Sequence, residues 1–195
     1  MRSKTITASA LTLTWLTGAV HAHDLTGHGG IQGGLMHPLL GLDHLLVCLA
    51  IGIWAGRQSG PSGRAIPGVF LAAVAAGAAA ALVGMTLPAP DPVLAATVLI
   101  AGLLVASLGS PARVTAVVAV TLIGLFHGNA HMIAAFTTTG LPGYLAAMLL
   151  TSALLVGTGM AAGRLLATRP GHSTWFRISG AAIATAGGFF LAGSV

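Results

Sequence analysis

Six long apolar segments, separated by short breaks, constrain this chain more than any other feature of its sequence. Each segment is close to the roughly 20 residues that an α-helix needs to cross the hydrocarbon core of a bilayer. Only 6% of the 195 residues are charged, whereas a soluble globular domain carries about a quarter. These features exclude an ordinary soluble fold. They predict an all-α, multi-pass membrane protein with six transmembrane helices, near residues 35–55, 66–87, 92–110, 113–136, 142–166 and 175–194.

Residues 1–22 have the layout of a secretory signal peptide. Arg2 and Lys4 form a positively charged start, an apolar stretch follows, and the small residue Ala22 ends it at a plausible cleavage site. We expect this segment to be cleaved, which leaves a transmembrane domain of residues 23–195. An uncleaved signal anchor is the alternative.

The arginines that follow the expected cleavage site fall in or beside loops on one side of the membrane. Positively charged residues mark the cytoplasmic loops of multi-pass proteins. We therefore expect a protein of the bacterial cytoplasmic (inner) membrane with both mature termini outside the cytoplasm. The arginines are Arg57, Arg64, Arg113, Arg164, Arg169 and Arg177.

The same composition excludes several other classes of protein. The eight Lys and Arg residues are spread along the chain and form no basic patch, which excludes nucleic acid as a partner. A single cysteine excludes an intramolecular disulfide framework and a Cys-rich metal site. Because no phosphate-binding loop or dinucleotide fingerprint occurs, nothing in the chain predicts ATP or an organic cofactor.

Two of the expected spans contain ionisable side chains, which are costly inside a bilayer and indicate a functional site. His37, Asp43 and His44 lie in the first span, and His127 and His131 lie in the fourth. With a rise of 1.5 Å per residue, His44 and His127 both lie roughly 14–15 Å below the outer surface. Because these two helices run in opposite directions, their imidazoles are at matching depth and can converge.

Several histidines with one carboxylate predict a site for a borderline divalent cation such as Ni²⁺, Co²⁺ or Zn²⁺. A single buried histidine is about as often a hydrogen-bond partner, but this set is predicted to bind metal. Pro38 and Gly41 could open the backbone beside the site. Weaker candidates are His23 and His28 at the mature N-terminus, Cys48 and Met132 as soft ligands, and Asn129 as a residue that orients a histidine.

Three glycine pairs, each spaced four residues apart, are predicted to allow close approach of neighbouring helix backbones. We interpret them as packing seams rather than as functional residues. The pairs are Gly52 with Gly56, Gly124 with Gly128, and Gly159 with Gly163.

The two histidine-bearing segments resemble the motifs of the HupE/UreJ family of nickel and cobalt permeases. The first motif has five residues between a histidine and an Asp-His pair, as between His37 and Asp43-His44 here. The second is a Phe-His-Gly-x-Ala-His block, which matches residues 126–131. The resemblance covers essentially the whole chain. It implies a permease, not an enzyme, that imports Ni²⁺ or Co²⁺ as an accessory to hydrogenase, urease or cobalamin synthesis.

The chain departs from the family pattern after the second motif. Met132 and Ala134 stand where relatives commonly have a glycine and an acidic residue. The site therefore lacks a carboxylate, and the metal preference of this chain can differ from that of its relatives.

Two other functions are compatible with intramembrane histidines. Three histidines and an aspartate could hold Zn²⁺ in a zinc-dependent hydrolase. Such an enzyme needs a further acid or base, and Asp43 is the sole carboxylate within the spans. A haem anchor with His44 and His127 as axial ligands is the third possibility.

Overall fold

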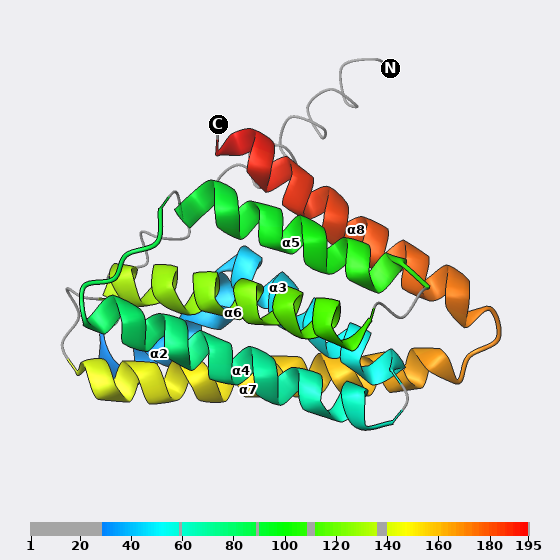
Figure 1. The fold of residues 1–195 in the computed structure, drawn as a ribbon, viewed down its shortest axis with the longest axis horizontal. Coiled ribbons are helices and arrows are strands. Elements are labelled where there is room, and N and C mark those ends of the chain that lie inside the picture. The colour runs from blue at the N-terminus through cyan, green and yellow to red at the C-terminus, as the bar shows by residue number, and fades with distance from the viewer. Residues whose placement is uncertain (1–28, 59, 89, 109–111, 136–139, 195) are drawn as a thin grey trace, which may run out of the picture.

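The chain folds into a bundle of helices (Figure 1). The computed structural model describes residues 29–194 except 59, 89, 109–111 and 136–139, and all regular structure in this part of the chain is helical. The all-α prediction is confirmed. The helices are α2 (Gly30–Leu40), α3 (Leu42–Arg57), α4 (Pro61–Leu82), α5 (Pro90–Ala106), α6 (Arg113–Ala135), α7 (Leu141–Ala167) and α8 (His172–Gly193). The expected signal peptide lies outside the described residues.

The first apolar segment is not the single span that the sequence predicts over 35–55. It forms two helices, α2 and α3, which meet at an angle of 71°. Gly41 adopts an extended conformation between them (φ −73°, ψ 102°), and Pro38 lies inside α2 just before the break. The local opening of the backbone predicted at Pro38 and Gly41 is confirmed, whereas one straight helix is not.

In the part of the chain that the structure describes, four helices are long and apolar enough to cross a membrane, namely α4, α6, α7 and α8. The bent pair of α2 and α3 makes a fifth candidate when it is counted as one span. With 17 residues, α5 is too short to count as a candidate by length. The described residues therefore indicate a multi-pass membrane protein with four or five spans, and the predicted number of six is not confirmed.

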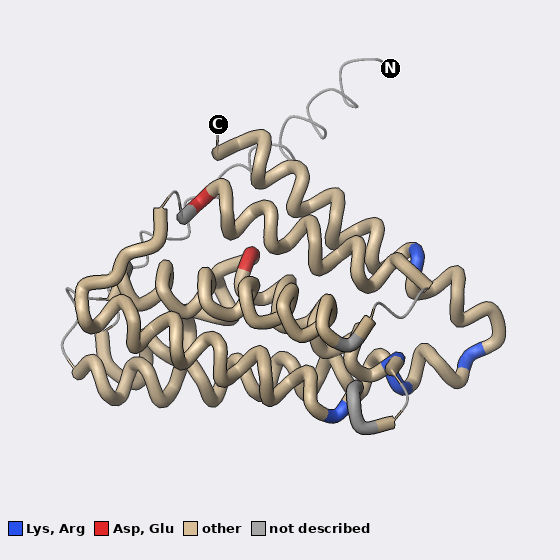
Figure 2. The backbone as a smooth tube through the Cα atoms, viewed as in Figure 1, with Lys and Arg blue, Asp and Glu red and all other residues tan. Residues whose placement is uncertain are grey.

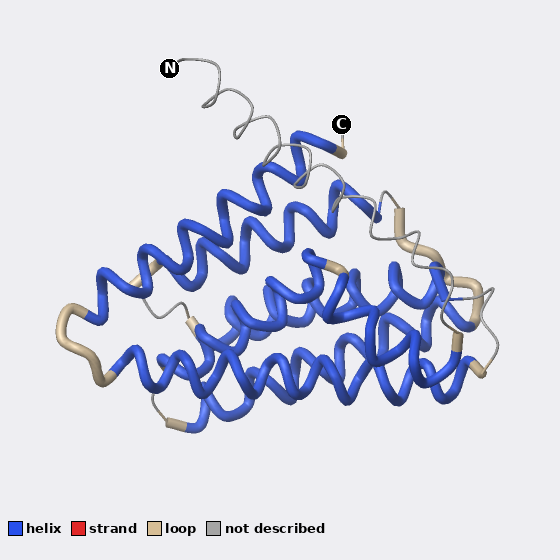
Figure 3. The backbone as a smooth tube through the Cα atoms, turned by 180° about the vertical axis from the view of Figure 1, so that it is seen from behind, coloured by secondary structure: helices blue, strands red, loops and turns tan. Residues whose placement is uncertain are grey.

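The helices pack in pairs, and the glycine pairs lie between them. α3 packs on α7, α4 on α6, and α5 on α8, and the α5–α8 pair lies along one side of the bundle in both views of the backbone (Figures 1 and 3). A side chain at Gly52 would overlap the carbonyl of Val156 on α7, and one at Gly128 would overlap the carbonyl of Val74 on α4. The interpretation of these glycines as packing seams is confirmed.

Arg57 joins α3 to the α5–α8 pair. Its guanidinium donates a hydrogen bond to the carbonyl of Ser107, just beyond the end of α5, and lies 5.4 Å from the centre of the Phe176 ring on α8. The Lys and Arg residues of the described chain gather at this end of the bundle (Figure 2). The core between the helices is apolar, with Trp54, Phe70 and Phe176 among its largest buried side chains.

Candidate metal centre

Four imidazoles from three helices meet inside the bundle. The ring centres of His44 on α3 and His127 on α6 are 5.5 Å apart, and those of His44 and His131 are 4.6 Å apart. His37 on α2 completes the group, with its ring centre 4.4 Å from that of His131. His44, His127 and His131 are buried. The convergence expected from the matching depths of His44 and His127 is observed, and metal binding stays a prediction.

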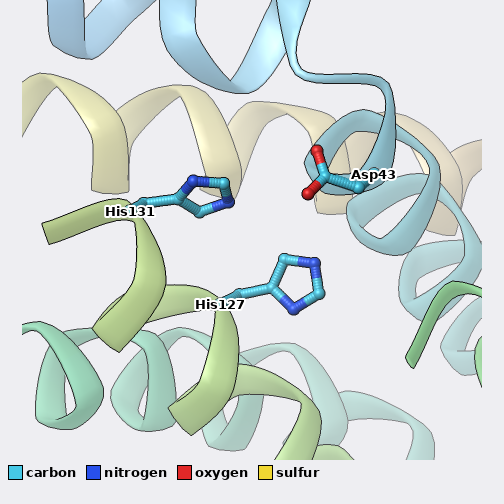
Figure 4. Close-up of side chains that lie close together, drawn as sticks. All are labelled: Asp43, His127 and His131. Atoms are coloured by element: carbon cyan, nitrogen blue, oxygen red, sulfur yellow. The ribbon is translucent and has the colours of Figure 1, made fainter. Parts of the chain in front are cut away.

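Asp43 brings a carboxylate to the imidazoles. It shares a cluster with His127 and His131 in which each residue offers one metal-ligand atom, and these atoms lie within 4.8 Å of one another (Figure 4). Asp43 lies in the first turn of α3 because the helix begins anew after Gly41. Its Oδ1 accepts a hydrogen bond of 2.8 Å from the backbone N–H of His44. The break at Gly41 therefore positions the carboxylate of the site.

One ring nitrogen of His127 has a hydrogen-bond partner, whereas the other has none in the described part of the chain. Nδ1 lies 3.0 Å from the carbonyl oxygen of Ile123, which can only accept a hydrogen bond, so Nδ1 carries the proton. The lone pair is therefore on Nε2, which is buried without a hydrogen-bond partner in the described part of the chain. An unsatisfied buried acceptor costs about 1–3 kcal/mol. A cation bound at Nε2 would satisfy it, and a carbonyl partner on the other nitrogen is the usual arrangement for a metal-binding histidine.

His37 and His44 have partners that the sequence did not indicate. Nε2 of His44 lies 2.8 Å from the hydroxyl oxygen of Ser152 on α7. Nε2 of His37 lies 2.5 Å from Nδ1 of His131, and its ring is 6.1 Å from that of Tyr144. Neither Ser152 nor Tyr144 was predicted from the sequence as part of the site. A serine in the middle of a mostly apolar helix of 27 residues was the available signal, because buried hydroxyls need partners.

Asn129 does not orient a histidine, contrary to the expectation from sequence. Its side-chain oxygen accepts a hydrogen bond from the N–H of Leu87 at 2.9 Å. Its side-chain nitrogen donates to the carbonyls of Gly77 at 3.2 Å and Met85 at 2.7 Å. This buried amide therefore ties the connection between α4 and α5 to α6, on a different side of the helix from the imidazoles.

Replacing Asn129 with alanine is expected to lower the free energy of unfolding by about 1–3 kcal/mol, because three backbone groups, one of them buried, lose their partner. Thermal unfolding of the purified protein in detergent measures the change. Limited proteolysis should then cut the connection near Met85, which is intact in the wild type. Asn129→Asp, which keeps the shape but loses both donors, should behave like the alanine variant. Wild-type stability in both variants would contradict the anchoring role.

The other weak candidates lie outside the cluster. Cys48 is buried and interacts with the hydroxyl of Ser152, and Met132 is buried in the apolar core. Cys48, like His37 and His44, does not belong to the group of metal-ligand atoms around Asp43. His23 and His28 lie outside the described residues. Asp43 is therefore the one carboxylate in this group among the described residues, and it offsets part of the charge of a divalent cation.

The chain is similar to known proteins along almost its whole length. The family model described as "HupE / UreJ protein" matches residues 11–190. Protein HupE from Rhizobium leguminosarum bv. viciae is 35% identical over 190 residues, which cover 97% of each chain. No solved structure matches the chain.

Proposed function

The chain belongs to the HupE/UreJ family, and we propose that it is a permease that imports Ni²⁺, Co²⁺ or both across the bacterial cytoplasmic membrane. The observation that carries this proposal is the buried group of Asp43, His127 and His131, whose ligand atoms lie within 4.8 Å of one another. Imidazole nitrogens with a single carboxylate suit a borderline divalent cation. The ion is the cargo of the protein and needs no organic cofactor.

The ion follows the histidines from the outer surface inward. His23 and His28 capture it near the mature N-terminus, and His37, which is half-buried, receives it. Asp43, His44, His127 and His131 then hold the dehydrated ion. A few neutral imidazoles and one carboxylate bind a cation less tightly than a closed thiolate cage, which favours release on the inner side.

The topology of the permease follows from its helices and its charges. Residues 1–22 act as a signal peptide that is removed, α2 and α3 together form the first span, and α5 forms the third, which gives six spans over residues 23–195. The arginine-rich end of the bundle (Figure 2) faces the cytoplasm, in agreement with the positive-inside rule. Both mature termini then lie outside the cytoplasm.

The zinc hydrolase considered from the sequence finds no support in the comparisons. The described cluster contains one carboxylate, Asp43, and as a metal ligand this residue is not available as the acid or base of a hydrolytic reaction. A transport protein without an enzymatic activity is the function that the cluster and the family favour together.

Uptake of radioactive nickel and cobalt by metal-starved cells tests the proposal. Cells that express the chain are expected to accumulate both ions faster than cells without it. Excess unlabelled Ni²⁺ or Co²⁺ should suppress the signal, whereas Mg²⁺ should not, because Mg²⁺ prefers oxygen ligands. Equal uptake with and without the chain, although the protein is found in the membrane, would overturn the proposal.

A further inference from the structure

The hydroxyl group of Ser152 has a single proton, and besides the thiol of Cys48 it has two close polar partners. Its oxygen lies 2.7 Å from the carbonyl oxygen of Met148 and 2.8 Å from Nε2 of His44. A carbonyl can only accept, and two oxygens at this distance repel unless a proton lies between them. The hydroxyl therefore donates to Met148 and is an acceptor toward His44.

An acceptor next to Nε2 fixes the position of the proton on the His44 ring. A neutral imidazole carries its proton on one nitrogen and a lone pair on the other. Nε2 must carry the proton in order to donate to Ser152, so the lone pair is on Nδ1. In the described part of the chain, Nδ1 of His44 is buried without a hydrogen-bond partner.

His127 is held in the opposite tautomer by a different group. The carbonyl of Ile123 accepts from its Nδ1, and the lone pair is on Nε2, which is also buried without a partner. The rings of His44 and His127 lie 5.5 Å apart. His44 on α3 and His127 on α6 thus each have one unpartnered lone pair, on a different ring nitrogen. In each ring a different hydrogen-bond partner fixes the position of the proton.

We propose that Ser152 is a positioning residue, which holds His44 in the Nε2-protonated tautomer so that Nδ1 binds the metal ion. The metal-binding part of this proposal rests on the proposed function, whereas the tautomer is a property of the metal-free protein. Partners that fix the tautomer of a metal-binding histidine commonly change metal affinity by about 10–100-fold when they are lost.

Nitrogen NMR of the metal-free protein, labelled at histidine and purified in detergent, tests the tautomer directly. The signal of His44, assigned by its loss in His44→Gln, should show a proton on Nε2 in the wild type. In Ser152→Ala the signal should shift toward a mixture of both tautomers, and Ser152→Thr, which keeps the hydroxyl, should restore the wild-type signal. A wild-type His44 with its proton on Nδ1 would overturn the proposal.

Titration of the same proteins with Ni²⁺ or Co²⁺ tests the consequence for binding. Ser152→Ala should raise the dissociation constant about 10-fold, and Ser152→Thr should not. Thr158→Val is the matched control, because the Thr158 hydroxyl on α7 also bonds the carbonyl four residues back but is exposed and lies outside the cluster. If Ser152→Ala binds metal as tightly as the wild type, the proposal that Nδ1 of His44 binds the ion is overturned.

The two measurements separate this proposal from the proposed function. A wild type that shows the expected tautomer but binds neither ion supports the tautomer assigned to His44 and overturns the permease. A wild type that binds metal with the proton of His44 on Nδ1 supports the permease and overturns the role of Ser152.

Discussion

Replacing His127 with alanine is expected to reduce the uptake of Ni²⁺ and Co²⁺ at least about 100-fold, because it removes a ligand itself, whereas loss of a ligand's hydrogen-bond partner already costs 10–100-fold. The buried lone pair on Nε2 of His127 is lost in this variant. His44→Ala should have a comparable effect, because the same ion would bind both rings. Uptake of the radioactive ions by metal-starved cells measures both variants.

His172→Ala is the matched control for these variants. His172 is an exposed histidine at the start of α8, away from the cluster, so its loss should leave uptake at the wild-type level. The amount of each variant in the membrane fraction, measured by immunoblot, separates loss of transport from loss of the protein. Normal uptake by His127→Ala that is correctly inserted would remove this residue from the ion pathway.

The histidine cluster could be predicted from sequence because helix geometry carries most of the information. The rise per residue puts His44 and His127 at matching depth in two apolar segments, and their rings lie 5.5 Å apart. Helix geometry also predicts the true direction of the Asn129 side chain, which the expectation that Asn129 orients a histidine did not take into account. Asn129 is two residues from both His127 and His131, which is about 200° around the helix, so its side chain points away from the site.

The position of the break in the first span could be predicted from the sequence, but the angle between α2 and α3 could not. Pro38 and Gly41 mark where the helix opens, and the sequence predicts this opening. The bend of 71° depends on how α2 packs on α7, where a side chain at Gly34 would overlap the carbonyl of Tyr144. A contact between residues so far apart in sequence leaves no local signal, and the segment therefore reads as one continuous span.

Ser152 could not be assigned to the site for the same reason. It lies 108 positions from His44 in the sequence, and their contact exists only because α3 and α7 pack closely along their glycines. Serine is common in helix–helix interfaces of membrane proteins, so its presence in an apolar segment does not by itself distinguish packing from a role beside a ligand. The site thus depends on the α3–α7 seam as well as on its own residues.

Replacing Gly159 with alanine is therefore expected to damage both the fold and the site. A Cβ atom at this position would overlap the carbonyl of Leu49 and come within 3.1 Å of the Cα atom of Gly52 on α3. Because these are backbone atoms, the helices must separate, at a cost of about 1–3 kcal/mol. Separation moves His44 away from Ser152, so metal affinity should fall together with the thermal stability measured in detergent.

Gly157→Ala provides the matched control for this last variant, since it makes the same change two residues away on the same helix. Among the described residues, no atom outside its own helix backbone lies within 4 Å of a Cβ at Gly157, and alanine is the better helix former by up to about 1 kcal/mol. Gly157→Ala should therefore be as stable as the wild type or slightly more stable, with unchanged metal affinity. If both variants melt at the same temperature and bind metal equally well, close approach of α3 and α7 at Gly159 is not what holds His44 in place.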